Sequence, residues 1–233
     1  MTILSIDIGG SKLKAALLDS DGKQVSERER VETPQPAPPK LVMPLLAELA
    51  AKLPGYERIS VGFPGSVRDG IVRTAPNLDT KSWAGFDFAR ALQDQLGKPA
   101  RVLNDASVQG FGAITGEGFE CLITLGTGMG FALFRSGRLA PHFELGQHIA
   151  HKDMTYDQFV GEAGLKDVGR KEWQKRVERA IAQIYTLVEY DTLLIGGGNA
   201  KKLNGDLGDN IRIVDNSAGI AGGAKLWAQD ALH

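Results

Sequence analysis

Two polar residues at the end of one apolar segment are suited to chemistry on a hydroxyl group. The segment ARVLNDA is typical of a strand that ends in Asn104 and Asp105. A carboxylate at the carboxyl end of a sheet strand can accept the proton of a substrate hydroxyl, and Asn104 can orient the same hydroxyl. Asn and Asp are also common helix N-caps, so a structural role for this pair stays open.

Two glycine turns each lie between consecutive predicted strands: DIGGSK (7–12) and LGTGMG (125–130). A dinucleotide fingerprint requires a helix directly after the glycine turn, and neither turn is followed by one. Neither turn has the Walker pattern. The turns are either tight hairpins only, or phosphate sites built from backbone N–H groups. As phosphate sites, they predict contacts from Gly9, Gly10, Ser11 and Lys12 in the first turn and from Gly126, Thr127 and Gly128 in the second.

Asp7 opens the first turn and needs a partner for its charge, which can be a metal ion, a lysine or water. We expect it to help bind Mg²⁺ through water, because magnesium keeps several waters and reaches proteins through one or two carboxylates plus substrate phosphates.

The stretch FELGQHIAH, residues 143–151, contains one carboxylate, one amide and two imidazoles. Its residue types alone are compatible with a metal site, a wall of a sugar pocket, or no function. Cys121 is the only cysteine, which excludes an internal disulfide and a cysteine-rich zinc loop. We expect Cys121 to be a buried small residue, and His142 and His151 to be surface or packed residues rather than ligands.

The composition of the chain excludes some classes of partner. The formal net charge is −1, so no overall field attracts nucleic acid or an anionic membrane surface. No signal-like start and no apolar span of about 18 residues occurs. We therefore expect a cytoplasmic protein without a membrane or nucleic-acid partner.

The elements that position these residues form a repeated pattern. A strand, a glycine turn, a second strand and a glycine hairpin open the chain, and ECLITLGTGMGFALFRSGRL repeats that plan. We predict an α/β fold of two duplicated βββαβα-type lobes, residues 1–105 and 106–233, with a central cleft. The second lobe contains a helix whose buried face is marked by Trp173, Val177, Ile181, Ile184 and Val188. Its basic flank consists of Lys171, Lys175, Arg176 and Arg179.

Eight segments in this order resemble the ROK family of sugar kinases and repressors, and within it the polyphosphate glucokinase and polyphosphate/ATP-glucomannokinase branch. They are IDIGGSKLK, VGFPGSV, TAPNLDTKSWAGFDF, RVLNDASVQGFGAI, LITLGTGMGFALF, GRKEWQKRV, LLIGGGNAKKL and VDNSAGIAGG. The resemblance extends over nearly the whole chain. The resemblance implies the actin-like ATPase (ribonuclease H-like) fold and a homodimer.

The resemblance also implies a hexose kinase, specifically a glucokinase. It would transfer a phosphoryl group from inorganic polyphosphate and/or ATP to the 6-hydroxyl of glucose or a related hexose, with Mg²⁺ and with Asp105 as the general base. The sugar hydroxyls would be bound by Asn77, Asn104 and Glu144. The donor would also contact Gly197, Gly198, Asn199, Lys201 and Lys202. Two basic clusters occur in the second half of the chain, one of Lys171, Lys175 and Arg176 and one of Lys201 and Lys202. They either bind a chain of phosphates or are solvated surface residues.

The chain departs from the family pattern at three places. The zinc-binding cysteine loop is missing, so no zinc is expected. Gln147 stands where the E-x-G-H pattern has histidine, with His148 one residue later. Asp157 stands near the position of a further family glutamate, with Glu162 as a looser candidate. Gln147, His148 and Asp157 are therefore candidate sugar-binding residues at which substrate preference differs.

Two alternatives to a glucokinase remain at this stage. One is a kinase for mannose or an N-acetylhexosamine that uses ATP only. The other is a non-catalytic sugar-binding or regulatory ROK protein. The family's repressors carry a DNA-binding segment before the kinase-like domain, and here the first glycine turn already begins at Asp7. A protein that only binds sugar would not need Asp105 or paired phosphate turns.

Overall fold

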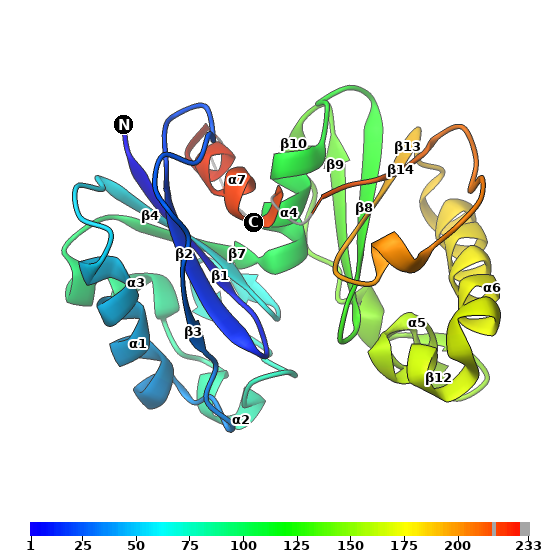
Figure 1. The fold of residues 1–233 in the computed structure, drawn as a ribbon, viewed down its shortest axis with the longest axis horizontal. Helices are drawn as coiled ribbons and strands as arrows, with labels where there is room; N and C mark the ends of the chain where they lie inside the picture. The colour runs from blue at the N-terminus through cyan, green and yellow to red at the C-terminus, as the bar shows by residue number, and fades with distance from the viewer. Residues whose placement is uncertain (216–217, 229–233) are drawn as a thin grey trace. The chain divides into compact units, whose positions relative to one another are not determined.

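A computed structural model describes residues 1–215 and 218–228, which form two compact units. Residues 1–112 and 218–228 belong to the first unit, and residues 113–215 to the second. Each unit is built on one five-stranded sheet (Figure 1). No helix in these described ranges is long and apolar enough to cross a membrane.

The sheet of the first unit has the strand order β3-β2-β1-β4-β7. Its strands are β1 (Ile3–Ile8), β2 (Lys12–Leu18), β3 (Glu29–Glu32), β4 (Arg58–Phe63) and β7 (Ala100–Asn104). Strand β2 is antiparallel to both of its neighbours, whereas β4 is parallel to β1 and β7. The carboxyl ends of β1, β4 and β7 therefore meet at one edge, where open α/β sheets bind ligands.

Helices cover both faces of this first sheet (Figure 1). On one face, α1 (Pro39–Ala51) and α3 (Phe88–Leu96) pack over the larger apolar core. On the other face lie α4 (Asp105–Ala113), α7 (Ala218–Ala221) and the 3-10 helix η3 (Gly222–Ala228). There the hydroxyls of Ser5 and Ser60 donate to the carbonyls of Ile220 and Gly223.

A short irregular segment between β4 and α3 carries the predicted sugar residue Asn77. It contains the hairpin of β5 (Val67–Arg68) and β6 (Ile71–Val72) and the one-turn helix α2 (Thr80–Trp83). The Trp83 indole N–H donates to the Ala37 carbonyl at 2.7 Å, and its ring centroid lies 4.9 Å from that of Phe63. Because Trp83 is fully buried, it anchors this segment to the core.

The sheet of the second unit repeats the first, with the order β10-β9-β8-β13-β14. Its strands are β8 (Phe119–Leu125), β9 (Met129–Arg135), β10 (Arg138–Leu139), β13 (Thr192–Gly196) and β14 (Ile211–Ile213). Strand β9 is antiparallel to β8 and β10, and β13 is parallel to β8 and β14. Order and directions both match the first sheet, which confirms the predicted α/β fold and duplication.

The second unit adds an insertion before its long helix. The insertion contains the 3-10 helix η1 (Leu145–Gln147), the hairpin of β11 (Ile149–His151) and β12 (Met154–Thr155), and α5 (Tyr156–Val160). Helix α6 (Glu162–Val188) follows and is kinked at Gly169, whose φ is 73°. A further 3-10 helix, η2 (Ala200–Lys202), follows β13. The predicted α6 face is confirmed, since Trp173, Val177, Ile181 and Ile184 are buried.

In the structure, the first unit extends beyond the expected boundary between residues 105 and 106. Helix α4 continues directly from β7 and packs on β4 and η3, so the first unit extends to residue 112. The segment 218–228 also returns to the first unit. There the guanidinium groups of Arg58 and Arg101 lie over the Trp227 ring, with their Cζ atoms 4.5 and 4.7 Å from its centroid. Local sequence patterns do not reveal such a return, because it depends on contacts between distant residues.

Candidate active site

The first glycine turn begins with an ion pair across β1 and β2. Asp7 lies directly opposite Lys14, whose ammonium donates to the Asp7 Oδ2 atom at 3.0 Å. A lysine is thus the partner of the Asp7 charge, one of the three partners that the sequence left open. The Asp7 side chain is 26% exposed, and its Oδ1 atom accepts no hydrogen bond within the described residues.

The turn itself is held by contacts to its carbonyl groups. Gly9 N–H donates to the Lys12 carbonyl at 3.0 Å, and the Thr33 hydroxyl donates to the Gly9 carbonyl at 2.7 Å. The Lys12 ammonium, a predicted phosphate contact, pairs with Glu32 at 3.4 Å on the neighbouring strand β3. Both side chains of this pair are well exposed, so the interaction is weak and an anion can compete for Lys12.

Asn77 lies against the first turn. A Cβ atom at Gly10 would be 3.7 Å from the Asn77 Cβ atom and from the Asn77 carbonyl oxygen. The structure thus brings this predicted sugar residue next to a predicted phosphate residue.

Asn104 and Asp105 join β7 to α4. The Asn104 Oδ1 atom accepts the N–H groups of Ala106 and Ser107, at 3.0 and 3.3 Å, and its amide donates to the Gly65 carbonyl at 3.2 Å. Asn104 therefore has the N-cap contacts that were the alternative to a sugar contact. The Asp105 Oδ1 atom accepts the Ala106 N–H at 2.8 Å. As the first residue of α4, Asp105 lies where the helix dipole stabilises a carboxylate.

The second glycine turn packs against the turn that follows β13. Asn199 N–H donates to the Leu125 carbonyl at 2.9 Å, and its side-chain amide donates to the Gly126 carbonyl at 3.3 Å. Gly197 has a φ of 87°, and a Cβ there would overlap the Leu125 backbone, so only glycine suits this approach. Two segments predicted to contact the donor, 125–128 and 197–199, therefore lie together.

Glu162 is the acidic residue of this second turn. Its N–H donates to the Gly126 carbonyl at 2.9 Å, and its carboxylate accepts the Asn199 amide at 2.9 Å. This hydrogen bond lowers the pKa of Glu162, and the nearby Lys202 and Lys166 lower it further. Lys202 lies 3.8 Å from the Glu162 carboxylate, whereas Lys201 is exposed. Glu162, the looser candidate for the family's sugar-binding glutamate, thus contacts the donor turns.

Gln147 and Asp157, two of the departures from the family pattern, contact each other. The Gln147 amide donates to the Asp157 Oδ2 atom at 2.5 Å, and Met129 N–H donates to Oδ1 at 2.7 Å. Burial raises the pKa of Asp157, and the charge of Glu144 raises it further, against the effect of these hydrogen bonds. A Cβ at Gly128 would overlap the Asp157 carboxylate, so this pair lies beside the second turn.

Glu144 has a partner that the sequence did not predict. The His142 Nε2 atom lies 3.3 Å from the Glu144 Oε2 atom, and the other ring nitrogen is buried without a hydrogen bond in the described residues. His142, expected to be a packed or surface residue, is therefore in contact with a predicted sugar residue. Gln147 and His148 are both exposed, and Gln147 is the one that donates a hydrogen bond to Asp157.

The structure carries no cluster of metal ligands in its described part. No three or more His, Cys, Asp or Glu side chains gather there in a way that could hold a metal ion. Cys121 is buried as expected, and burial raises the pKa of its thiol.

Residues 3–162, which include both glycine turns, match the model of the ROK family. The chain belongs to the ROK family. It is 32% identical to a polyphosphate glucokinase of Mycobacterium tuberculosis, over 98% of this chain and 92% of that protein. It also resembles the crystal structure of the inorganic polyphosphate/ATP-glucomannokinase from Arthrobacter sp. strain KM, with 31% identity and a TM-score of 0.87. That match covers 97% of this chain and 98% of the other.

One further ROK structure supports the fold alone. A ROK family glucokinase from Streptomyces griseus, solved with glucose and AMPPNP, is 19% identical and has a TM-score of 0.76. It covers 97% of this chain and 99% of that one.

Proposed function

We propose that this ROK protein is a hexose kinase, specifically a glucokinase, that uses inorganic polyphosphate and/or ATP. The observation that carries this proposal is the 32% identity to a polyphosphate glucokinase, because it extends over 98% of this chain and spans both glycine turns and Asp105. The non-catalytic alternative is not favoured, since a protein that only binds sugar gains nothing from a carboxylate at the end of β7 or from two phosphate turns.

Asp105 acts as the general base in the proposed reaction. It takes the proton of the sugar 6-hydroxyl while that oxygen forms its bond to phosphorus and the bond between phosphorus and the donor oxygen breaks. The N-terminus of α4 supports this role, because a helix N-terminus stabilises the negative charge of a carboxylate placed there. Positioning and charge neutralisation supply most of the remaining catalysis in phosphoryl transfer.

Magnesium fits the first turn as a partner of the donor phosphates. The fit rests on Asp7, because one of its carboxylate oxygens carries no hydrogen bond within the described residues and the side chain is partly exposed. When bound, Mg²⁺ neutralises charge on the phosphates. Asp7 would hold its water shell, while Gly9, Gly10 and Ser11 contact phosphate oxygens.

The predicted sugar residues are Asn77, Asn104, Glu144, Gln147, His148 and Asp157. Glu144 and Asp157 supply acceptors for sugar hydroxyls, and their partners His142 and Gln147 orient them. Gln147 and Asp157, which contact each other, are the residues at which a preference for another hexose would arise. Cytoplasmic location and a homodimer are further parts of the proposal, on the basis of family resemblance.

A coupled assay of the purified protein tests the proposal directly. Glucose, mannose and the N-acetylhexosamines are each supplied with ATP and with polyphosphate, with and without Mg²⁺. We expect Mg²⁺-dependent formation of glucose 6-phosphate. Absence of turnover with every sugar and donor pair, in a protein shown to be folded, would contradict the kinase assignment.

The donor is tested with Lys201→Ala combined with Lys202→Ala. We expect the KM for polyphosphate to rise about tenfold and the KM for ATP about twofold, because a long chain of phosphates depends more on such point charges. Lys23→Ala with Lys98→Ala, two exposed residues of the first unit, is the control of equal charge change. Equal loss with both donors would count against a polyphosphate path over η2.

A further inference from the structure

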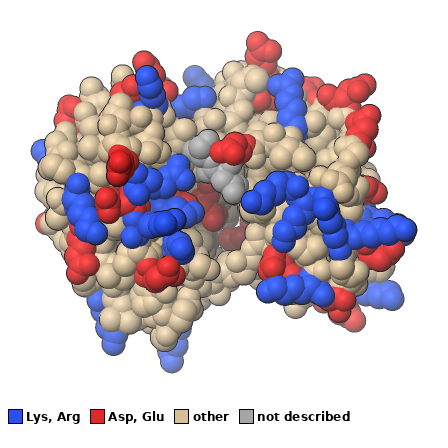
Figure 2. Space-filling model, viewed as in Figure 1, with Lys and Arg blue, Asp and Glu red and all other residues tan. Residues whose placement is uncertain are grey.

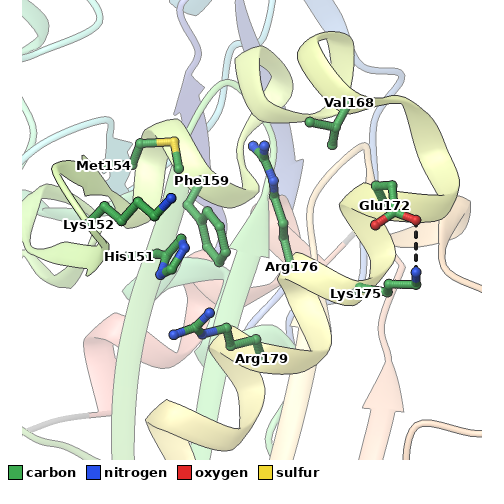
Figure 3. Close-up of a pocket in the computed structure, with 9 residues that line it drawn as sticks. All are labelled: His151, Lys152, Met154, Phe159, Val168, Glu172, Lys175, Arg176 and Arg179. Atoms are coloured by element: carbon green, nitrogen blue, oxygen red, sulfur yellow. Dashed lines mark hydrogen bonds and ion pairs between the residues drawn. The ribbon is translucent and has the colours of Figure 1, made fainter.

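A cationic pocket of about 420 Å³ opens in the second unit, between the β11–β12 hairpin, α5 and α6 (Figure 3). Four cationic side chains and one carboxylate line it, together with a histidine and three apolar residues. These charged residues are Lys152, Lys175, Arg176, Arg179 and Glu172. The volume lies in the range of small-ligand pockets, roughly 300–1,000 Å³. Figure 2 shows Lys and Arg side chains gathered on the face of the second unit that carries η2 and α6.

The carboxylate does not neutralise the pocket. Glu172 accepts the Lys175 ammonium at 2.8 Å, at one side of the pocket and away from the other cations (Figure 3). Within the described residues, Lys152 and Arg179 form no ion pair. The pocket therefore has an excess of positive charge.

Arg176 lines the wall of this pocket with its guanidinium group partly buried. Its side chain is only 18% exposed, and its Cζ atom lies 5.2 Å from the centroid of the Phe159 ring. The Nη2 atom pairs with the exposed Asp167 at 3.3 Å, whereas the buried Nη1 atom has no hydrogen-bond partner in the described part of the chain. Because Asp167 is exposed, its pairing only weakly offsets the positive charge that Arg176 adds to the pocket.

His151 reports the same electrostatic environment. Its ring centroid lies 5.5 Å from that of Phe159, and Figure 3 shows the Arg179 guanidinium extending toward it. The pKa of His151 lies below its ordinary value, chiefly because neighbouring atoms desolvate the ring and further because the surrounding cations repel its proton. An anion in the pocket would reverse the second effect.

We propose that this pocket is a second phosphate-binding site, in which Arg179 and Lys152, on either side of His151, contact the oxygens of one phosphate group. Guanidinium groups suit this task because their planar fork matches phosphate oxygens. The site is distinct from the donor turns of the same unit. The α6 residues that line the pocket lie around and beyond the kink at Gly169. Glu162, which contacts the donor turns, lies at the other side of that kink, at the start of α6.

The site is tested by NMR titration of His151 with orthophosphate and with tripolyphosphate, at constant ionic strength. We expect the phosphate probe to raise the His151 pKa, and the variant Lys152→Gln/Arg179→Gln to weaken binding about tenfold. Both residues are exposed, so the variant keeps the fold. Lys98→Gln/Arg212→Gln changes the same residue types at exposed positions outside the pocket and should bind as the wild type does.

The two probes separate the sources of the phosphate group. If tripolyphosphate acts at concentrations where orthophosphate does not, the site takes part of a phosphate chain; if both act alike, it takes a free phosphate or a phosphate ester. An unchanged His151 pKa with both probes would overturn the proposal, as would equal weakening in the control pair. The titration needs no turnover, so its outcome is independent of the kinase assignment.

Discussion

The two sheets of this protein carry different side chains at equivalent positions. In the first unit, Asp7 precedes the glycine turn and forms an ion pair with Lys14 on the adjacent strand, at 3.0 Å. In the second unit, Thr124 holds the corresponding place before its turn and lies opposite Gly130, whose N–H donates to the Thr124 hydroxyl at 3.0 Å. A charged pair in one sheet is thus a neutral hydrogen bond in the other.

The difference shows that the duplication keeps the backbone while the charges diverge. The register is preserved, because Asp7 and Thr124 each lie beside a glycine on the next parallel strand, Gly62 and Gly196. The second turn obtains its carboxylate from a helix instead, through Glu162 at the start of α6. The two proposed phosphate turns therefore differ, and only the first has a carboxylate at the turn end of the strand that precedes it.

The largest expected effect concerns Asp105, the residue that follows β7 of the first sheet. Asp105→Asn should lower turnover by a factor of about 10³, because the amide cannot accept the hydroxyl proton. The coupled assay measures this, with circular dichroism as a check on the fold. The control is Asp209→Asn, at an exposed position before β14 of the second sheet, which should leave turnover unchanged. Near-normal turnover in the Asp105 variant would remove its assignment as the base.

The paired positions Asp7 and Thr124 give the next largest effect. Asp7→Asn should lower turnover roughly 10–100-fold at limiting Mg²⁺, because the water shell of the metal loses its charged partner. Thr124→Val should leave turnover within about twofold but cost about 1–3 kcal/mol of stability, because the Gly130 N–H loses its acceptor. Mg²⁺ titrations of turnover and urea unfolding separate the two. Similar activity losses in both variants would refute a functional difference between the turns.

Much of the fold was predictable because it depends on local patterns. The repeated strands and glycine turns indicated the duplicated α/β plan, and the spacing of Trp173, Val177 and Ile181 indicated the buried face of α6. The return of residues 218–228 to the first sheet was not predictable, since it rests on distant contacts such as Trp227 with Arg58 and Arg101.

The candidate site was predictable in its positions but not in its contacts. The turns and Asp105 follow from strand ends, whereas the partners Lys14 for Asp7 and His142 for Glu144 depend on side-chain geometry. His142 and Glu144 are two positions apart in the sequence, but many unrelated surface residues have the same separation. The pairing of Gln147 with Asp157 also required the structure, because ten residues and a hairpin separate them.

The second unit contains a paired replacement that can be reversed. Gln147→His and Asp157→Glu restore the side chains that the family pattern has at these positions. Each single variant should raise the KM for the sugar roughly fivefold, the loss of about one hydrogen bond, because the new side chain does not match the old partner. The double variant should recover part of the loss and change the ratio of glucose to mannose turnover. Additive effects in this cycle would show that the two residues do not act as a pair.

The smallest expected effect is on stability, and it concerns Asp157, a half-buried carboxylate of the second unit. Burial raises the folded-state pKa of Asp157 above its unfolded value, so the ionised carboxylate destabilises the fold at neutral pH. That penalty disappears as the pH falls through the folded-state pKa toward the unfolded one. The wild type should therefore gain stability relative to Asp157→Asn as the solution is acidified, measured by urea unfolding of both proteins over a pH series. A stability difference that stays constant, or that grows in the opposite direction, would show that Asp157 titrates normally and that its position beside Gln147 is solvated.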